Sequence, residues 1–135
     1  MTVLRIAQNV MLKNKITVDA DILIWYLRGD DTVAAEVEEY LANDIQLAAS
    51  MVVVLEVLRG MRPNERMATE ALLESIEQIS IDAAVTQAAF ELFKSERRRG
   101  HTLPFADSII AATAVVAEAP LLTANKKDFP AHILV

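Results

Sequence analysis

The chain has 135 residues, of which 53% are hydrophobic and 24% charged, so it fits one globular domain and is too apolar for general disorder. The chain has no cysteine, so it can form neither disulfides nor thiolate metal sites, and its two histidines make an imidazole zinc site unlikely. Any bound metal should therefore be an ion that prefers oxygen ligands, such as Mg²⁺ or Mn²⁺. A net charge of −6 argues against binding nucleic acid through bulk electrostatics, although divalent ions on carboxylates can still attract a phosphate.

The N-terminal segment, residues 1–14, is expected to be an extension outside the main domain, which would span residues 15–135. No apolar run approaches the roughly 20 residues of a membrane span, and the N-terminus lacks the continuous hydrophobic core of a signal peptide. We therefore expect a cytoplasmic protein with no membrane partner.

Short apolar segments alternate with amphipathic ones along the rest of the chain. We expect strands at residues 15–18, 45–48, 78–81 and 121–123, with a weak fifth strand at 133–135. We expect helices at residues 22–27, 32–41, 51–60, 64–77, 82–99 and 104–119. This alternation predicts an α/β fold of three layers, with a central parallel sheet of four to five strands covered by helices on both faces. Ligands of such sheets bind beyond the carboxyl ends of the strands.

Three acids stand alone in apolar surroundings. Asp19 directly follows the first expected strand, where it is either a site residue or the N-cap of the next helix. Glu56 lies in the most apolar expected helix, with Arg59 three residues on as an alternative ion-pair partner. Asp107 falls near the first turn of the helix opened by Pro104, where the helix dipole alone would also favour an acid.

A shared cation would account for all three acids, because an ionised carboxylate is costly to bury without compensation. Divalent ions on several oxygen ligands can activate water for in-line attack on a phosphate. We therefore predict that Asp19, Glu56 and Asp107 hold Mg²⁺ or Mn²⁺.

Four segments together resemble the motifs of PIN domains, and most closely those of VapC-type toxins from bacterial and archaeal toxin–antitoxin pairs. The segments are VDADILI at residues 18–24, LEVLRG at 55–60, LPFADSIIAA at 103–112 and LTANKKDF at 122–129. The resemblance covers the chain from about Lys15 to its end. It implies a PIN-like fold and a Mg²⁺- or Mn²⁺-dependent ribonuclease with an RNA substrate, a small antitoxin partner and a homodimeric state.

The resemblance places Asp19, Glu56 and Asp107 at the first three acidic positions of the family. At the fourth, where many members carry aspartate, this chain has Asn125, so we include it in the catalytic set as a neutral oxygen ligand or water-orienting group. Asp128 either compensates for the missing charge or simply precedes the last turn, which we favour. Asp21 stands where relatives often have asparagine or serine, so it is either an auxiliary contact for metal or water or an ordinary first-turn acid, the interpretation we prefer. Thr123 is interpreted as a partner of a site carboxylate or a turn cap.

Two charge clusters complete the pattern. The cations Lys94, Arg97, Arg98 and Arg99 end a helix, where they either form a solvated C-terminus, the interpretation we prefer, or guide RNA. Six acids and no base lie between Asp30 and Asp44 and should form a solvated face, which would suit a basic segment of an antitoxin.

Two other functions fit parts of the sequence. Asp19-Ala20-Asp21 after a strand also resembles the start of haloacid-dehalogenase-type phosphatases, in which Asp19 would be the nucleophile. That pattern usually has threonine or valine where this chain has Leu23. Asn125 also leaves open a non-catalytic PIN-fold module that only binds a partner.

Overall fold

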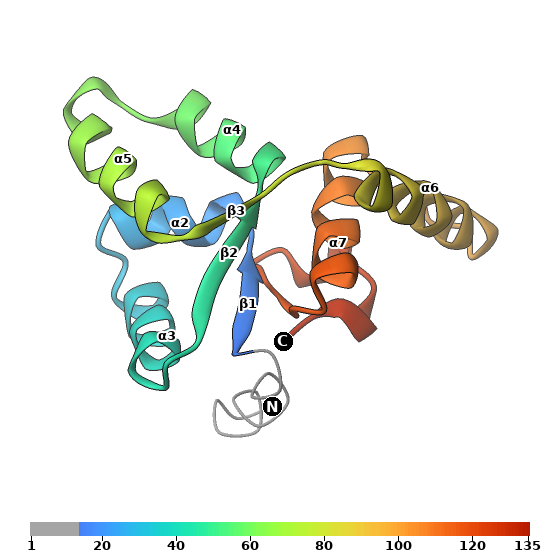
Figure 1. Cartoon of the computed structure of the whole chain (residues 1–135), viewed down its shortest axis with the longest axis horizontal. Helices are drawn as coiled ribbons and strands as arrows, with labels where there is room; N and C mark the ends of the chain where they lie inside the picture. Colours follow the sequence, from blue (N-terminus) through green and yellow to red (C-terminus); the bar gives the residue numbers. More distant parts are fainter. Residues whose placement is uncertain (1–13) are drawn as a thin grey trace.

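The computed structural model describes residues 14–135, and residues 1–13, which include nearly all of the expected N-terminal extension, lie outside the described part. Four parallel strands form one sheet in the order β3-β2-β1-β4 (Figure 1). Their bounds are β1 (Lys15–Val18), β2 (Gln46–Ser50), β3 (Glu77–Ile79) and β4 (Leu121–Leu122). In β1, Thr17 pairs with Ala48 on one side and with Leu121 on the other. The switch in strand order therefore lies between β1 and β4, where ligands of α/β sheets commonly bind.

Helices cover both faces of the sheet, which confirms the expected α/β fold. Figure 1 shows α2, α3 and α5 on one side and α7 on the other, with α6 packed outside α7. The helices are α2 (Ala20–Leu27), α3 (Asp31–Ala42), α4 (Met51–Gly60), α5 (Arg66–Ser75), α6 (Ala83–Arg98) and α7 (Phe105–Ala117). Short 3₁₀ helices lie at Pro63–Glu65, Lys126–Asp128 and Ala131–Ile133. None of the helices in residues 14–135 is both long and apolar enough to cross a membrane.

The main core lies between the sheet and its flanking helices. Strands β1 and β4 contribute the fully buried side chains of Ile16 and Leu121, and α4 contributes Val53 and Val57. A continuous apolar run is typical of a parallel strand covered on both faces, and it explains why these short strands are legible in the sequence. The carboxyl ends of the strands are thereby held in a rigid frame.

Local signals set most of the helix ends. The Ser50 hydroxyl accepts from the Val52 N–H at the start of α4, and the Asp82 carboxylate accepts from the Val85 N–H at the start of α6. Gly100, with φ of +79°, follows the last turn of α6 in the left-handed region that favours glycine. Serine and aspartate are favoured at helix N-caps and glycine just after a helix C-terminus, so these residues account for the helix ends.

Most expected boundaries shift by one or two residues, and the third strand covers Glu77–Ile79 rather than residues 78–81. Three further differences have an identifiable cause. The weak fifth strand is a single bridge between Leu134 and Leu121, because the preceding residues form a 3₁₀ helix after Pro130. Pro104 is the N-cap rather than the first helical residue, with extended φ and ψ of −56° and 152°. The helix expected at residues 64–77 is split into a 3₁₀ turn and α5, since Pro63 begins the turn.

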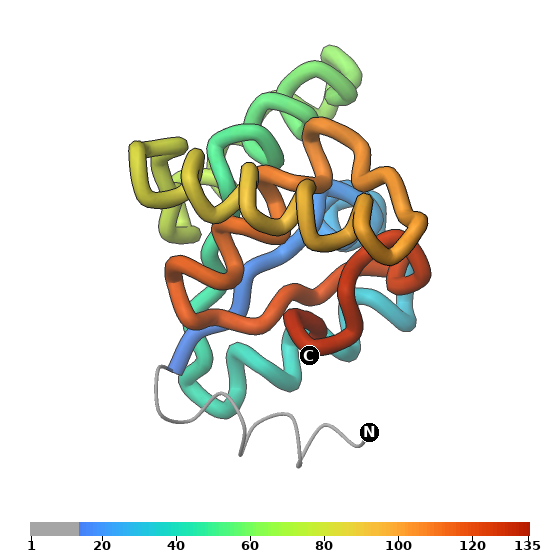
Figure 2. Tube along the Cα trace, turned by 90° about the vertical axis from the view of Figure 1, so that its right-hand side faces the viewer, coloured from blue at the N-terminus to red at the C-terminus, as the bar shows by residue number. Residues whose placement is uncertain are grey.

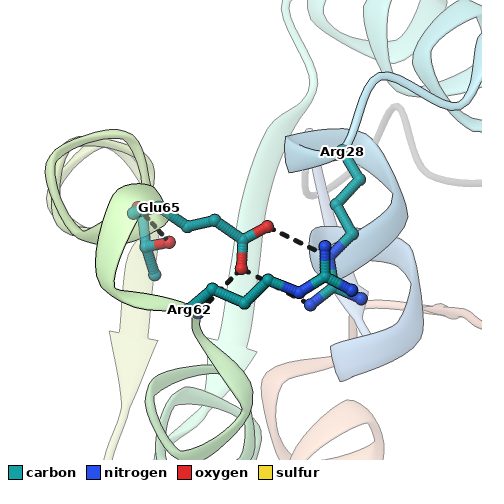
Figure 3. Close-up of polar contacts among 4 residues, drawn as sticks. Arg28, Arg62 and Glu65 are labelled. Atoms are coloured by element: carbon teal, nitrogen blue, oxygen red, sulfur yellow. Dashed lines mark hydrogen bonds and ion pairs between the residues drawn. The ribbon is translucent and has the colours of Figure 1, made fainter.

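A surface ion-pair cluster joins α2 to the turn before α5 (Figure 3). The Arg28 guanidinium donates from Nε to Oε2 of Glu65 at 3.0 Å, and the Arg62 backbone N–H donates to Oε1 of Glu65 at 2.8 Å. Hydrogen bonding from Arg28 is the main cause that lowers the pKa of Glu65, followed by the Arg62 N–H. Each acceptor oxygen of this acid therefore has a donor.

Candidate active site

Asp19 is the buried centre of a group of acids beyond the carboxyl end of β1. It is the N-cap of α2, and its side chain is 8% exposed. Its Oδ1 accepts from the Ala20 N–H at 2.8 Å, and its Oδ2 accepts from the Thr123 hydroxyl at 2.8 Å. Both interpretations of Asp19 from the sequence therefore describe the structure, and the two hydrogen bonds fix the orientation of its carboxylate.

Thr123 links the end of β4 to the end of β1. Its buried hydroxyl donates to Asp19 and also accepts from the Asn125 N–H at 3.0 Å. The Asn125 side-chain amide donates to the Asp128 carboxylate. Asn125 thus lies beside Thr123, next to the acids, at the fourth predicted position of the site, but its side-chain amide donates its hydrogen bond to Asp128.

Asp21 is more closely tied to the site than the sequence suggests. Its Oδ1 is buried and has no hydrogen-bond partner within residues 14–135. Burial, followed by the negative charge of Asp19, raises the pKa of Asp21 to about 6, although the backbone amides of Ile22 and Ala124 oppose the shift. An ordinary first-turn acid would be solvated, so that interpretation does not account for the buried oxygen. The spacing of two residues from Asp19 was the available signal.

Glu56 projects from α4 into the same electrostatic environment. Burial is the largest cause that raises its pKa, and the charges of Asp19 and Asp107 add to the shift. Arg59 opposes the shift, but none of the ion pairs in residues 14–135 joins Arg59 to Glu56. The helical ion pair considered from the sequence therefore does not form.

Asp107 lies in the first turn of α7 and is partly buried. Burial raises its pKa first, and the charges of Asp19 and Asp128 raise it further. A helix dipole acting alone would favour the ionised acid and lower the pKa, whereas burial and the neighbouring carboxylates together raise the pKa of Asp107. Asp128, which we interpreted as a residue before the last turn, lies close enough to influence the site.

The acids suit a hard divalent cation in their chemistry. They offer oxygen donors, the negative charge of Asp19 raises the pKa of Asp21, Glu56 and Asp107, and one buried oxygen of Asp21 lacks a partner in the described residues. No group of three or more histidine, aspartate or glutamate side chains in residues 14–135 is arranged to hold a metal ion as it stands. The donor set and its charge fit a cation, and the side chains would have to converge to ligate one.

Comparison with known proteins identifies the family. The sequence model of the PIN domain matches residues 16–132. This chain belongs to the PIN domain family. This membership confirms the resemblance seen in the four motifs. The matched residues include Asp19-Ala20-Asp21, on which the phosphatase alternative was based, so that alternative is set aside.

Relatives of this PIN domain carry VapC names. Ribonuclease VapC10 of Mycobacterium tuberculosis is 36% identical over 118 residues, which cover 85% of this chain and 86% of the relative. Ribonuclease VapC19 of the same organism is 32% identical over 113 residues, which cover 84% of this chain and 90% of the relative. The PIN domain is thus homologous to VapC proteins over most of its length.

Solved structures share the fold. A toxin–antitoxin complex from Klebsiella pneumoniae matches with a TM-score of 0.73 and 26% identity, over 84% of this chain and 89% of the matched chain. VapBC2 from Rickettsia felis, bound to a DNA fragment from its promoter, matches with a TM-score of 0.77 and 23% identity, over 90% and 96%. The second likeness supports the three-layer fold alone.

Proposed function

We propose that this PIN domain is a metal-dependent ribonuclease, the toxin of a VapBC-type toxin–antitoxin pair, and that Asp19, Glu56 and Asp107 form its active site. One observation carries the proposal: Asp19 raises the pKa of both Glu56 and Asp107, so acids from three separate elements share one electrostatic environment. The VapC ribonucleases among the relatives support the reaction class. The uncompensated carboxylates favour a catalytic role over a module that only binds a partner.

In the proposed mechanism, Asp19 and Asp107 hold the principal Mg²⁺ or Mn²⁺ ion. When bound, such an ion polarises the phosphate and activates water for in-line attack. Asp19 is oriented by Thr123 and the Ala20 N–H, so its carboxylate is fixed before substrate arrives. Glu56 either completes the ligand set or positions the attacking water, and Asn125 contributes a neutral group beside Asp128.

Cleavage of a labelled RNA in Mg²⁺ or Mn²⁺ tests the proposal. We expect Asp19→Asn and Asp107→Asn each to lower the rate at least ~100-fold, because each removes a ligand charge while retaining side-chain shape. Glu38→Gln is the control, since Glu38 is exposed on α3 and is not among the charges that shift the pKa of Asp21, Glu56 or Asp107. Undiminished cleavage by either aspartate variant, with the control active, would remove the proposal.

The acidic face of α3 supports an antitoxin as a partner. Within residues 30–44 the acids Asp30, Asp31, Glu38, Glu39 and Asp44 are exposed and Glu36 is half-buried. We propose that a basic antitoxin segment binds there, because complementary charge favours association. Co-purification of the chain with a candidate antitoxin should therefore weaken when Glu38 and Glu39 are changed to glutamine, and unchanged co-purification would exclude this face.

A second copy of the chain is proposed to cover an apolar cleft of about 430 Å³ between α6 and α7. Phe90, Phe93 and Phe105 line this cleft, and Phe105 is 84% exposed. Exposed apolar patches rimmed by polar residues mark association surfaces. Light scattering should give a dimer for the wild type and a monomer for Phe105→Ser.

We propose that the protein acts in the cytoplasm, where its RNA substrate lies.

A further inference from the structure

A strongly basic face lies on an otherwise acidic molecule. Four of the chain's 13 lysines and arginines fall within six residues at the end of α6: Lys94, Arg97, Arg98 and Arg99. All four side chains are exposed. Because the whole chain carries a net charge of −6, this local surplus is not a consequence of composition.

The basic side chains are largely free of compensating acids. Within residues 14–135, Arg97, Arg98 and Arg99 form no ion pair. Lys94 pairs with Glu91 at 3.3 Å across the exposed helix surface, where such a pair contributes little. Glu96, the one acid within the cluster, is buried, and its Oε2 lies 3.3 Å from Nδ1 of His101. The charge presented to solvent is therefore positive.

Helix capping does not account for the cluster. Backbone N–H groups of Arg99, Gly100 and His101 already donate to carbonyls of the last turn of α6. The favourable effect of the helix dipole on cations is confined to that last turn, and Lys94 stands before it. The sequence interpretation as a solvated helix end therefore leaves part of the cluster unexplained.

Three of the cations lie on one helix face. Lys94, Arg97 and Arg98 have the spacing i, i+3, i+4, which places their side chains next to one another. They line an open surface cavity of about 320 Å³. Guanidinium groups bind phosphate through two parallel hydrogen bonds, so such a cavity suits a phosphodiester backbone.

The helix that bears the basic face packs against the helix that carries Asp107. Ala89 of α6 packs against Ala112 of α7, and Leu92 and Ile109 pack in the same small cluster. The two helices run in opposite directions, as Figure 2 shows where α6 crosses the front and the chain turns back into α7. The end of α6 projects away from α7 in Figure 1, so the basic face lies at the outer end of α6.

We propose that this basic face, Lys94, Arg97 and Arg98, binds the phosphodiester backbone of single-stranded RNA that extends beyond the active site. The inference rests on the proposed ribonuclease function and adds a surface that holds the substrate. The chemistry of the face favours RNA over an acidic protein segment, because adjacent guanidinium groups match the repeated phosphates of a nucleic-acid strand.

Binding without cleavage separates this inference from the proposed function. Fluorescence anisotropy with a labelled single-stranded RNA would compare Arg97→Gln/Arg98→Gln with Arg62→Gln/Arg66→Gln, both in the full chain carrying Asp19→Asn. The control pair removes the same charge from exposed residues around α5, on the opposite side of the molecule in Figure 1. Circular dichroism would verify that both variants fold.

We expect the Arg97/Arg98 variant to bind RNA about tenfold more weakly or worse, since charge-assisted hydrogen bonds to phosphate are lost. The slope of log Kd against log salt concentration should become shallower by about 1.4, because each of the two lost phosphate contacts contributes ~0.7 to that slope. In the wild-type background the same change should raise KM and leave kcat nearly unchanged, and Arg97→Lys/Arg98→Lys should restore much of the binding.

Equal affinities and salt slopes for the two variants would overturn the proposal. Loss of antitoxin co-purification with RNA binding intact would also overturn it and assign the face to a protein partner. If the wild type binds RNA through this face but never cleaves it, the ribonuclease proposal fails while the binding surface stands.

Discussion

Two groups of acids in this PIN domain are built in opposite ways. Glu65 lies at the surface between Arg28 and Arg62, each of its oxygens accepts a hydrogen bond, and its pKa is lowered (Figure 3). The acids around Asp19 have their pKa raised by burial and by the negative charge of Asp19, and Asp21 keeps a buried oxygen without a partner in the described residues. One cluster is electrostatically complete, and the other is not.

The contrast separates an acid that joins two elements of the fold from the acids that we propose act in catalysis. A paired acid such as Glu65 joins two elements and leaves little attraction for a further cation. Uncompensated acids reduce the stability of the metal-free protein, because the fold must keep like charges close together. That cost is consistent with a site that acquires its cation from solution.

The largest expected effect compares the same substitution in the two clusters. Glu56→Gln should lower RNA cleavage in Mn²⁺ by about 100-fold or more, because it removes a charge that ligates the ion or positions water. Glu65→Gln should leave the cleavage rate unchanged and only lower the melting temperature slightly. Similar rates for both variants would show that Glu56 is not a site residue.

Removal of the hydroxyl that orients Asp19 should have the next largest effect. Thr123→Val leaves Oδ2 of Asp19 and the Asn125 N–H without their buried partner, which should cost about 2 kcal/mol of unfolding free energy. Cleavage should fall roughly tenfold, as for other groups that orient metal ligands. Urea denaturation and a cleavage assay measure the two effects.

Thr113→Val is the matched control for that change. Thr113 is equally buried, but its hydroxyl donates only within α7, to the Ile109 carbonyl at 2.8 Å. We expect it to retain full activity and to lose less stability, since the carbonyl belongs to the helix ladder. Equal losses in the two valine variants would mean that the bond to Asp19 has no special role.

The pH dependence of stability should have opposite signs in the two clusters. In EDTA, the protonated form of Asp21 is favoured in the folded state up to its pKa of about 6, above the ordinary value of 3.8. Its stabilising contribution is complete below pH 3.8 and is lost as pH rises through 6. Asp21→Asn should therefore be more stable than the wild type by about 1–2 kcal/mol at pH 7.5 and indistinguishable from it near pH 4.

Glu65 provides the reverse case. Because its folded pKa is lowered below the ordinary 4.5, its contribution is present above pH 4.5 and is lost as pH falls through the folded value. Glu65→Gln should therefore be less stable than the wild type at pH 7.5, and the difference should shrink in acid. Thermal melts across pH would contradict the comparison if both variants shifted in the same direction.

The fold was largely predictable because its signals are local. Apolar residues mark β1, β2 and β4, and Ser50, Asp82 and Gly100 lie at helix ends. The third strand, Glu77–Ile79, carries one apolar residue and was expected one residue too late. The fifth strand failed because its pairing depends on one bridge from Leu134 to Leu121, which no local pattern specifies. The 3₁₀ turn that begins at Pro63 separates residues 63–65 from α5, and the helical periodicity of the sequence does not reveal this break.

The sequence predicts which acids belong to the candidate site, but it does not predict the hydrogen bonds between the site residues. Asp19, Glu56 and Asp107 are conspicuous as single acids in apolar segments, and the four motifs place them in order. The buried oxygen of Asp21 and the bond from Asn125 to Asp128 depend on how loops after β1 and β4 meet. Contacts of that kind arise from tertiary packing, so residue type and spacing do not determine them.

The smallest expected effect concerns the fourth corner, where Asn125 replaces the acid common in the family. Asn125→Asp would lose the hydrogen bond to Asp128 and add a like charge beside it, so the uncompensated cluster would become more strained. In EDTA we expect a loss of about 0.5–1 kcal/mol, since Asn125 is exposed, and hence a melting temperature roughly 1–4 °C lower.

Saturating Mn²⁺ should reverse that loss, because a cation bound to the folded state stabilises it by mass action and the variant offers it one more negative charge. Asn64→Asp makes the same charge change at an exposed residue before α5, where the helix N-terminus tolerates an acid, and should show neither effect. A melting temperature for Asn125→Asp that responds to Mn²⁺ no more than that of Asn64→Asp would place residue 125 outside the metal's influence. The group of uncompensated acids would then include Asp128 but not position 125.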